Sequence, residues 1–165
     1  MANENLQDLY LEQLRDLHSA EHQILEALPK MIGKTTHPDL KQALQEHKSI
    51  TEKQVQRLES IFTELGEKPG GHKCKGMEGL LTEGEEALRD FKDGDVLDAA
   101  IIASAQRVEH YEMAGYGTVR SMANMLGFDK QAQLLQETLE EEGEADQRLS
   151  GLAERVVNID ALKAD

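Results

Sequence analysis

The stretch "LLQETLEEEGEADQRLSGLAERV", residues 134–156, decides the fold because it combines a helical pattern with acids placed inside it. Apolar residues recur at steps of three and four, the spacing of the buried face of a helix. They are Leu135, Leu139, Leu149, Ala153 and Val156. The same face also includes Glu142 and Asp146. These carboxylates need partners if they are buried, because an uncompensated charge in an apolar interior is strongly unfavourable.

Three other segments repeat this periodicity, and the connections between them predict how the helices are arranged. We expect long helices over 5–32, 38–65, 95–126 and 129–158. Short loops join the first two and the last two, and such loops make antiparallel hairpins. The long connection 66–94 contains a short amphipathic segment at 80–91 and can return along the bundle. The sequence therefore predicts one all-α domain over 1–165: a four-helix bundle of two antiparallel hairpins joined by a long crossover carrying a short extra helix.

Composition narrows the classes of function. The chain has 165 residues, enough for one core, and a formal net charge of -14, which argues against non-specific binding to nucleic acid or to anionic lipid. No apolar run approaches the roughly 18 residues that a membrane span needs. The start "MANENLQDLY" lacks the basic and apolar regions of a signal peptide. A single cysteine, Cys74, fits a reducing compartment, so we expect a cytoplasmic protein.

Polar residues also interrupt the apolar stripes of the other long helices near mid-length. The first helix has Glu21, the third has Glu109 and Glu112, and the second has a polar run. That run consists of His47, Thr51 and Gln54. In an antiparallel hairpin, residues equally far from the turn face each other. Glu21 is then expected beside His47, Glu109 opposite Asp146, and Glu112 beside Glu142.

This layer of acids predicts a metal site. Protons, buried cationic side chains or metal ions could neutralise it, and the stripes offer no lysine or arginine nearby. Carboxylate oxygens with one imidazole suit iron(II), manganese(II) or zinc, and bundle cores hold such ions. The predicted ligands are Glu21, His47, Glu109, Glu112, Glu142 and Asp146. Thr51, Gln54 and Tyr116 are expected to orient them.

Each residue taken alone has a simpler interpretation. Glu142 lies in the acidic run "EEEGE", which is typical of a solvated helix face, and a lone histidine such as His47 often packs in a core. His18, one turn before Glu21, either joins the site or packs structurally. His72 near Cys74 offers too few ligands for a zinc knuckle. The common depth of the polar residues on four helices is what favours a metal site.

Longer motifs resemble a known family. The segments are "SAEHQILEALPKM", "EHKSITEKQVQRLESIF", "CKGMEGLLTEG", "RVEHYEMAGYGTVR" and "LEEEGEADQRLSGLAE". Together they are similar to the YciE/YciF-type ferritin-like family, and the resemblance covers nearly the whole chain. It implies a ferritin-like bundle, a homodimer, a bacterial source and a link to stress responses. It supplies no settled reaction.

The wider ferritin-like class implies a two-metal site with Glu on two helices and Glu-x-x-His on the other two, and this sequence departs from that pattern. Leu44 stands three residues before His47, and no histidine accompanies Glu142. The hypothesis is a centre of two divalent ions, iron or manganese, acting on peroxide, oxygen or iron under stress. The alternatives are a non-catalytic dimeric helical module with a structural or absent metal, and simple metal sequestration.

Overall fold

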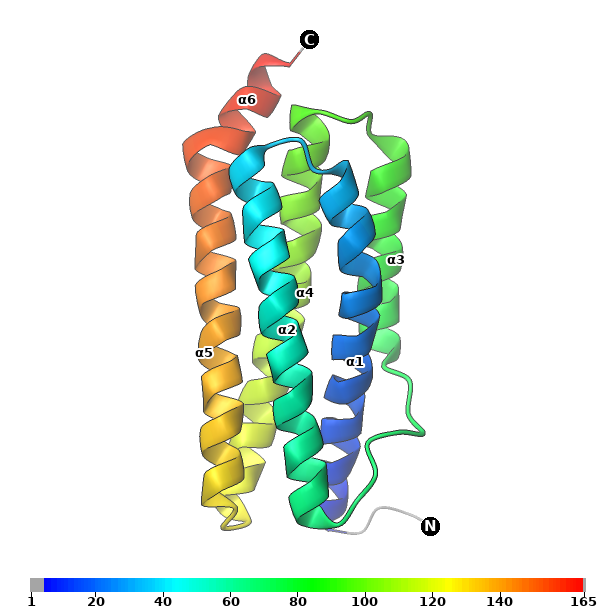
Figure 1. The fold of residues 1–165 in the computed structure, drawn as a ribbon, viewed down its shortest axis with the longest axis vertical. Helices are drawn as coiled ribbons and strands as arrows, with labels where there is room; N and C mark the ends of the chain where they lie inside the picture. The colour runs from blue at the N-terminus through cyan, green and yellow to red at the C-terminus, as the bar shows by residue number, and fades with distance from the viewer. Residues whose placement is uncertain (1–4, 165) are drawn as a thin grey trace.

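The computed structural model describes residues 5–164, and the described residues form a helical bundle without strands. The ends of the predicted domain, 1–4 and 165, lie outside the described residues, as does the start of the segment assessed for a signal peptide. Figure 1 shows four long helices side by side, and they are α1 (Leu6–Lys34), α2 (Pro38–Leu65), α4 (Asp95–Met125) and α5 (Asp129–Leu152). The crossover helix α3 (Lys75–Asp90) packs against α1 and α4. The predicted four-helix arrangement is confirmed.

Two segments differ from the sequence-based boundaries. The crossover helix begins at Lys75 rather than 80, because the Cys74 sulfur accepts the backbone N–H of Met77 at 3.3 Å and caps an earlier first turn. At the other end, α5 continues into a π-helical turn, η1 (Ala153–Val157), and then α6 (Asn158–Lys163). The π turn inserts one extra residue per turn and changes the direction in which later side chains point.

The interior consists of two apolar clusters with a polar layer between them. One cluster contains Ile24 and Leu44, and the other contains Leu14 and Leu58. Along α1, Glu21 falls between Leu17 and Ile24, which belong to different clusters. The helices are therefore held together above and below the layer by ordinary hydrophobic burial, so the layer itself does not have to stabilise the fold.

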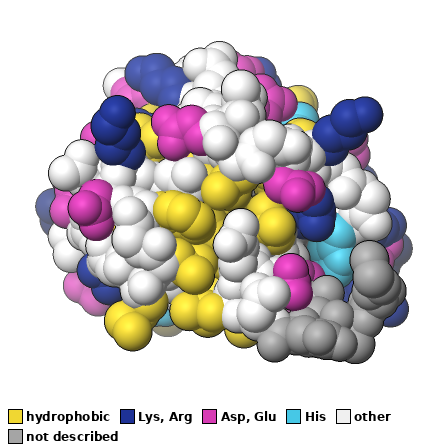
Figure 2. Space-filling view, turned by 90° about the horizontal axis from the view of Figure 1, so that it is seen from below, with side chains coloured by type: hydrophobic (Ala, Val, Ile, Leu, Met, Phe, Trp, Pro, Cys, Tyr) yellow, Lys and Arg dark blue, Asp and Glu magenta, His cyan; other side chains and the backbone are white. Residues whose placement is uncertain are grey.

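The surface carries charged and apolar regions. Figure 2, seen from the end where the α4–α5 turn lies, shows hydrophobic side chains gathered in the middle with acidic and basic side chains around them. Exposed large apolar side chains include Met125 and Leu162. No helix within residues 5–164 combines the length and hydrophobicity needed to cross a lipid bilayer.

Candidate metal centre

Four side chains from three helices meet in the polar layer. His47 comes from α2, Glu109 and Glu112 from α4, and Glu142 from α5. One ligand atom of each lies within 4.8 Å of the others, and the group could hold a metal ion. The exposed fractions are 8% for His47 and at most 2% for the three glutamates. Glu142 therefore lies in the interior, although its acidic run is typical of a solvated face.

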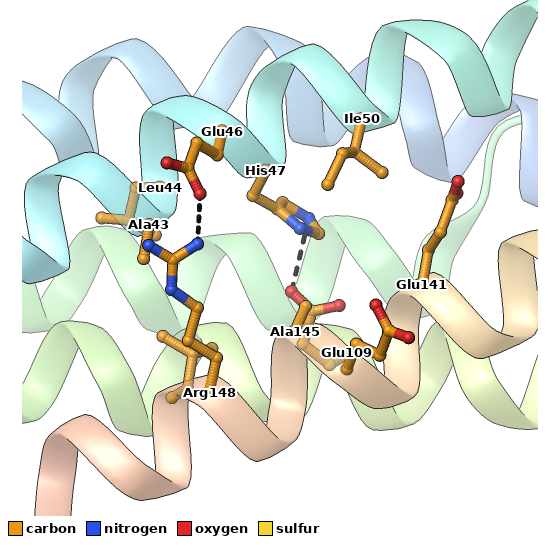
Figure 3. Close-up of a pocket in the computed structure, with 11 residues that line it drawn as sticks. Ala43, Leu44, Glu46, His47, Ile50, Glu109, Glu141, Ala145 and Arg148 are labelled. Atoms are coloured by element: carbon orange, nitrogen blue, oxygen red, sulfur yellow. Dashed lines mark hydrogen bonds and ion pairs between the residues drawn. The ribbon is translucent and has the colours of Figure 1, made fainter.

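Most oxygen atoms in this group have no hydrogen-bond partner. Both carboxyl oxygens of Glu112 and of Glu142 are buried without one, as is Oε2 of Glu109. His47 Nε2 lies 3.3 Å from Glu109 Oε1, as drawn in Figure 3, but the geometry falls short of a hydrogen bond. Buried polar atoms are nearly always paired, and each unpaired one costs about 1–3 kcal/mol. The donor set thus fits a cation at this position.

Burial and mutual repulsion favour the protonated acids when no cation is present. Burial, then the charge of Glu142, raises the pKa of Glu112 well above its usual range. Burial also raises the pKa of Glu109, again with a contribution from Glu142. A bound divalent cation would replace these protons, so metal binding and proton release are coupled here.

Glu21 borders the group from the fourth long helix. It is fully buried on α1, and its Oε1 accepts a hydrogen bond from the Tyr116 hydroxyl. Its Oε2 has no partner. Burial, then the charge of Glu142, raises the pKa of Glu21 to about 8. Glu21 does not belong to the set of four within 4.8 Å, so its role as a ligand remains a prediction, with one free oxygen available for it.

Asp146 lies outside the four-residue group. Its Oδ1 accepts from Gln106 at 3.1 Å, and its Oδ2 lies 3.2 Å from His110 Nε2, whose side chain is 67% exposed. Asp146 therefore contacts Gln106, one helical turn before Glu109, and its charge also acts on Glu109, so its role as a ligand stays a prediction. The connection between α4 and α5 is tight: Gly127 has φ 76°, and the Phe128 N–H bonds the Ala123 carbonyl.

The residues expected to orient the ligands make other contacts as well. Thr51 donates its hydroxyl hydrogen to the His47 carbonyl at 2.9 Å, within α2. Gln54 donates to Glu141 at 3.1 Å, and Arg57 holds Glu141 through two hydrogen bonds of 2.6 and 2.8 Å. Sequence reasoning missed Arg57 and Glu141. The spacing along the sequence could have indicated Arg57, since it follows Gln54 by three residues and so lies on the same helix face.

A cavity of about 150 Å³ between α2 and α5 leads to this group. His47 and Glu109 lie on its wall, and the ion pair of Arg148 with Glu46 crosses from α5 to α2 beside it (Figure 3). Apolar side chains, including Leu44 and Leu149, complete the wall. The buried group is therefore accessible to a small molecule from one side of the bundle.

The bundle has the ferritin-like fold, whereas its buried carboxylates and single imidazole depart from the Glu-x-x-His pairs of the two-metal site in that class. The fold agrees with a two-domain protein of Anabaena variabilis that contains a ferritin-like domain. Its TM-score is 0.65 at 21% identity, covering 95% of this chain and 39% of the other.

The chain belongs to the YciE/YciF-type family, whose sequence profile is described as a domain of unknown function (DUF892) and matches residues 5–162. It is 41% identical over 159 residues to protein YciF of Escherichia coli K12, covering 96% of each. The crystal structure of that stress protein gives a TM-score of 0.90 over 94% of this chain and 98% of the other. The structure of YcfI of Rhodopseudomonas palustris gives a TM-score of 0.87 at 45% identity, covering 90% of this chain and 94% of the other. That protein is named as a candidate structural protein.

Proposed function

We propose that this protein binds two divalent metal ions in the buried layer and uses them on peroxide, oxygen or iron in a stress response. The observation that carries the proposal is the set of buried, unpartnered oxygens on Glu112 and Glu142 next to His47. Four glutamates reach the layer when Glu21 is included. Two divalent ions neutralise four carboxylates, whereas one ion leaves excess negative charge in a dry interior.

The donor set favours iron or manganese. Oxygen-rich sites suit hard cations such as manganese and magnesium, and the imidazole of His47 adds a donor that iron accepts well. Softer ions prefer thiolate or several imidazoles, and the layer has no thiolate. The single cysteine, Cys74, caps α3 rather than facing the layer. Because the chain has a single cysteine, we also propose that the protein works in the reducing environment of the cytoplasm.

The protein's own residues would control access and position. The cavity beside His47 and Glu109 admits molecules as small as peroxide or dioxygen. The Tyr116 hydroxyl holds one oxygen of Glu21, which leaves the other free to face the layer. When bound, a redox-active pair of ions supplies electrons for reduction of such an oxidant. The E. coli relative is named a stress protein, which supports a role in stress.

Metal content and turnover test this proposal together. The protein is purified without chelator, its metals are measured by elemental analysis, and anomalous diffraction locates them. We expect two ions of iron or manganese per chain in the layer and loss of hydrogen peroxide in proportion to metal content. Glu112→Gln keeps the shape of the side chain and is expected to lose both metal and activity. A native protein and a Glu112→Gln variant with equal metal content contradict the proposal.

A second candidate function is a non-catalytic dimeric module. The R. palustris relative is named as a candidate structural protein, and exposed apolar side chains such as Met125 offer contact area for a second copy. A metal-free chain that remains fully folded and dimeric in solution, with no peroxide loss when metal is restored, supports this alternative. Tight metal retention without any turnover supports sequestration instead.

A further inference from the structure

The outer surface of the α1–α2 hairpin carries a second group of ligand-type side chains. His18 and His22 lie one turn apart on α1, and Glu59 lies on α2. One ligand atom of each falls within 4.8 Å of the others. The two Nε2 atoms are 3.2 Å apart, and His18 Nε2 lies 3.7 Å from Glu59 Oε1. Three electron-rich atoms therefore converge on one point outside the core layer.

A proton between the imidazoles, with water on the exposed Glu59, can satisfy these atoms in pairs, but a proton cannot join all three. A neutral imidazole has one N–H donor and one acceptor nitrogen. If His18 Nε2 carries the proton, it can donate to Glu59 or to His22, but not fully to both. If it instead accepts from His22, its lone pair faces the Glu59 carboxylate. A cation at the centre would satisfy all three atoms at once.

The distances and the support of the rings fit such a cation. Around a four-coordinate zinc with bonds of about 2.0–2.2 Å, neighbouring ligand atoms lie about 3.3–3.5 Å apart. Histidines four residues apart on a helix share one face and are an established zinc-binding pair. The His18 ring packs edge-on against Phe62, with ring centroids 6.0 Å apart, and its side chain is only 14% exposed. Packing against Phe62 therefore fixes the position of the His18 imidazole in the metal-free protein.

We propose that His18, His22 and Glu59 form a surface site for one transition-metal ion of the zinc class, with a coordination position left for water. Two imidazoles and one carboxylate favour zinc, cobalt, nickel or copper, whereas the oxygen-rich core layer favours harder ions. The two sites then differ in selectivity. Because its ligands come from both helices, the surface ion also links α1 to α2.

The site is built for binding rather than hydrolysis. Residues 18–22 have the order His-x-x-Glu-His, and in zinc peptidases with this type of motif the glutamate acts as general base. Here Glu21 points the other way: it is fully buried and accepts a hydrogen bond from Tyr116. No general base from this motif therefore reaches an ion held by His18 and His22.

Zinc titration of the metal-free full-length chain tests the site by calorimetry. His22→Ala changes an exposed side chain, and we expect it to bind one equivalent of zinc fewer than the native protein. Glu59→Gln keeps the side-chain shape and is expected to weaken that equivalent by about tenfold or more. The matched control is His72→Ala, which removes another exposed imidazole, one that lies 3.0 Å from Asp16. It is expected to bind zinc as the native protein does.

Native zinc binding in His22→Ala or in Glu59→Gln overturns the proposal, and so does loss of the same equivalent in His72→Ala. The core variant Glu112→Gln separates this site from the proposed function: it is expected to keep the surface equivalent while losing core metal. Loss of the surface equivalent in Glu112→Gln also overturns the assignment. Anomalous diffraction at the zinc edge should place the ion between α1 and α2.

Discussion

Two regions of this protein bury carboxylates, and they differ in whether hydrogen-bond donors surround them. The difference indicates which region is suited to bind a metal ion. Asp98 on α4 is 1% exposed and accepts from the Thr36 N–H at 2.9 Å, the Thr36 hydroxyl at 2.6 Å and the His37 N–H at 2.8 Å. Glu112 and Glu142 are equally buried, yet no N–H or hydroxyl group pairs with their oxygens, which interact with the neighbouring acids Glu21 and Glu109. Burial of an acid is therefore not by itself evidence for a bound cation. Burial of an acid that no N–H or hydroxyl donor reaches is such evidence.

Metal binding should show the largest contrast between the two regions. We expect Glu142→Gln to lower affinity for manganese or iron by about 100-fold or more, because it removes one ligand charge from the layer. Asp98→Asn, the matched control, should leave affinity unchanged because its three donors lie outside the layer. Equilibrium dialysis with each ion measures both. Equal losses of metal affinity in the two variants would contradict the assignment of the metal site to the layer of Glu142.

In the metal-free protein, the protonation of the acids in the buried layer should determine how the free energy of unfolding depends on pH. Burial, then the charge of Glu142, raises the pKa of Glu21 to about 8, whereas an unfolded glutamate titrates near pH 4.3. Between these values the folded state keeps a proton that the unfolded chain releases. Stability should therefore fall as pH rises through this window, by up to about 1.4 kcal/mol per pH unit per proton.

Urea midpoints measured with chelator between about pH 5 and about pH 8 check this slope. Glu21→Gln cannot release the proton, so its slope should be shallower. Asp98→Asn is expected to retain the native slope. A native midpoint that rises across the window would show that the acids of the layer are ionised and stabilised without metal.

Removing Asp98 should destabilise the fold through its donors. Asp98→Ala leaves the Thr36 hydroxyl and two backbone N–H groups without their carboxylate partner in a partly buried site. We expect a loss of about 3 kcal/mol in the free energy of unfolding, since each group costs about 1–3 kcal/mol and part of the loss relaxes. Chemical denaturation measures it. A loss below the error of the method would mean that water replaces the carboxylate.

Removing Glu142 should have the opposite and smaller effect in the metal-free protein. Glu142→Leu replaces a buried acid that repels Glu109 and Glu112 with an apolar side chain of similar size. We expect stability to rise by about 1–3 kcal/mol when chelator is present. A urea midpoint that drops sharply for this variant would indicate that Glu142 makes favourable contacts without metal.

The stripes of Leu, Ile and Val predicted the four long helices because helical phase is a local property of the sequence. The interruptions at Glu21, His47 and Glu142 predicted a polar layer for the same reason. Asp146 shows what this reasoning leaves open. It shares the stripe with Glu142, but the contact of its carboxylate with Gln106 depends on the register between α4 and α5. The donors around Asp98 come from the loop after α1, which no stripe describes.

The sequence by itself determined the helices, their pairing into two hairpins and the height at which acids enter the core. Each of these depends on spacing along one segment or on the length of a connection. The tertiary structure alone decided which oxygens remain unpaired, which acid turns toward Gln106 and which histidines meet Glu59 on the outside. Those outcomes depend on the register and rotation between helices, which packing and turn geometry set over long sequence distances.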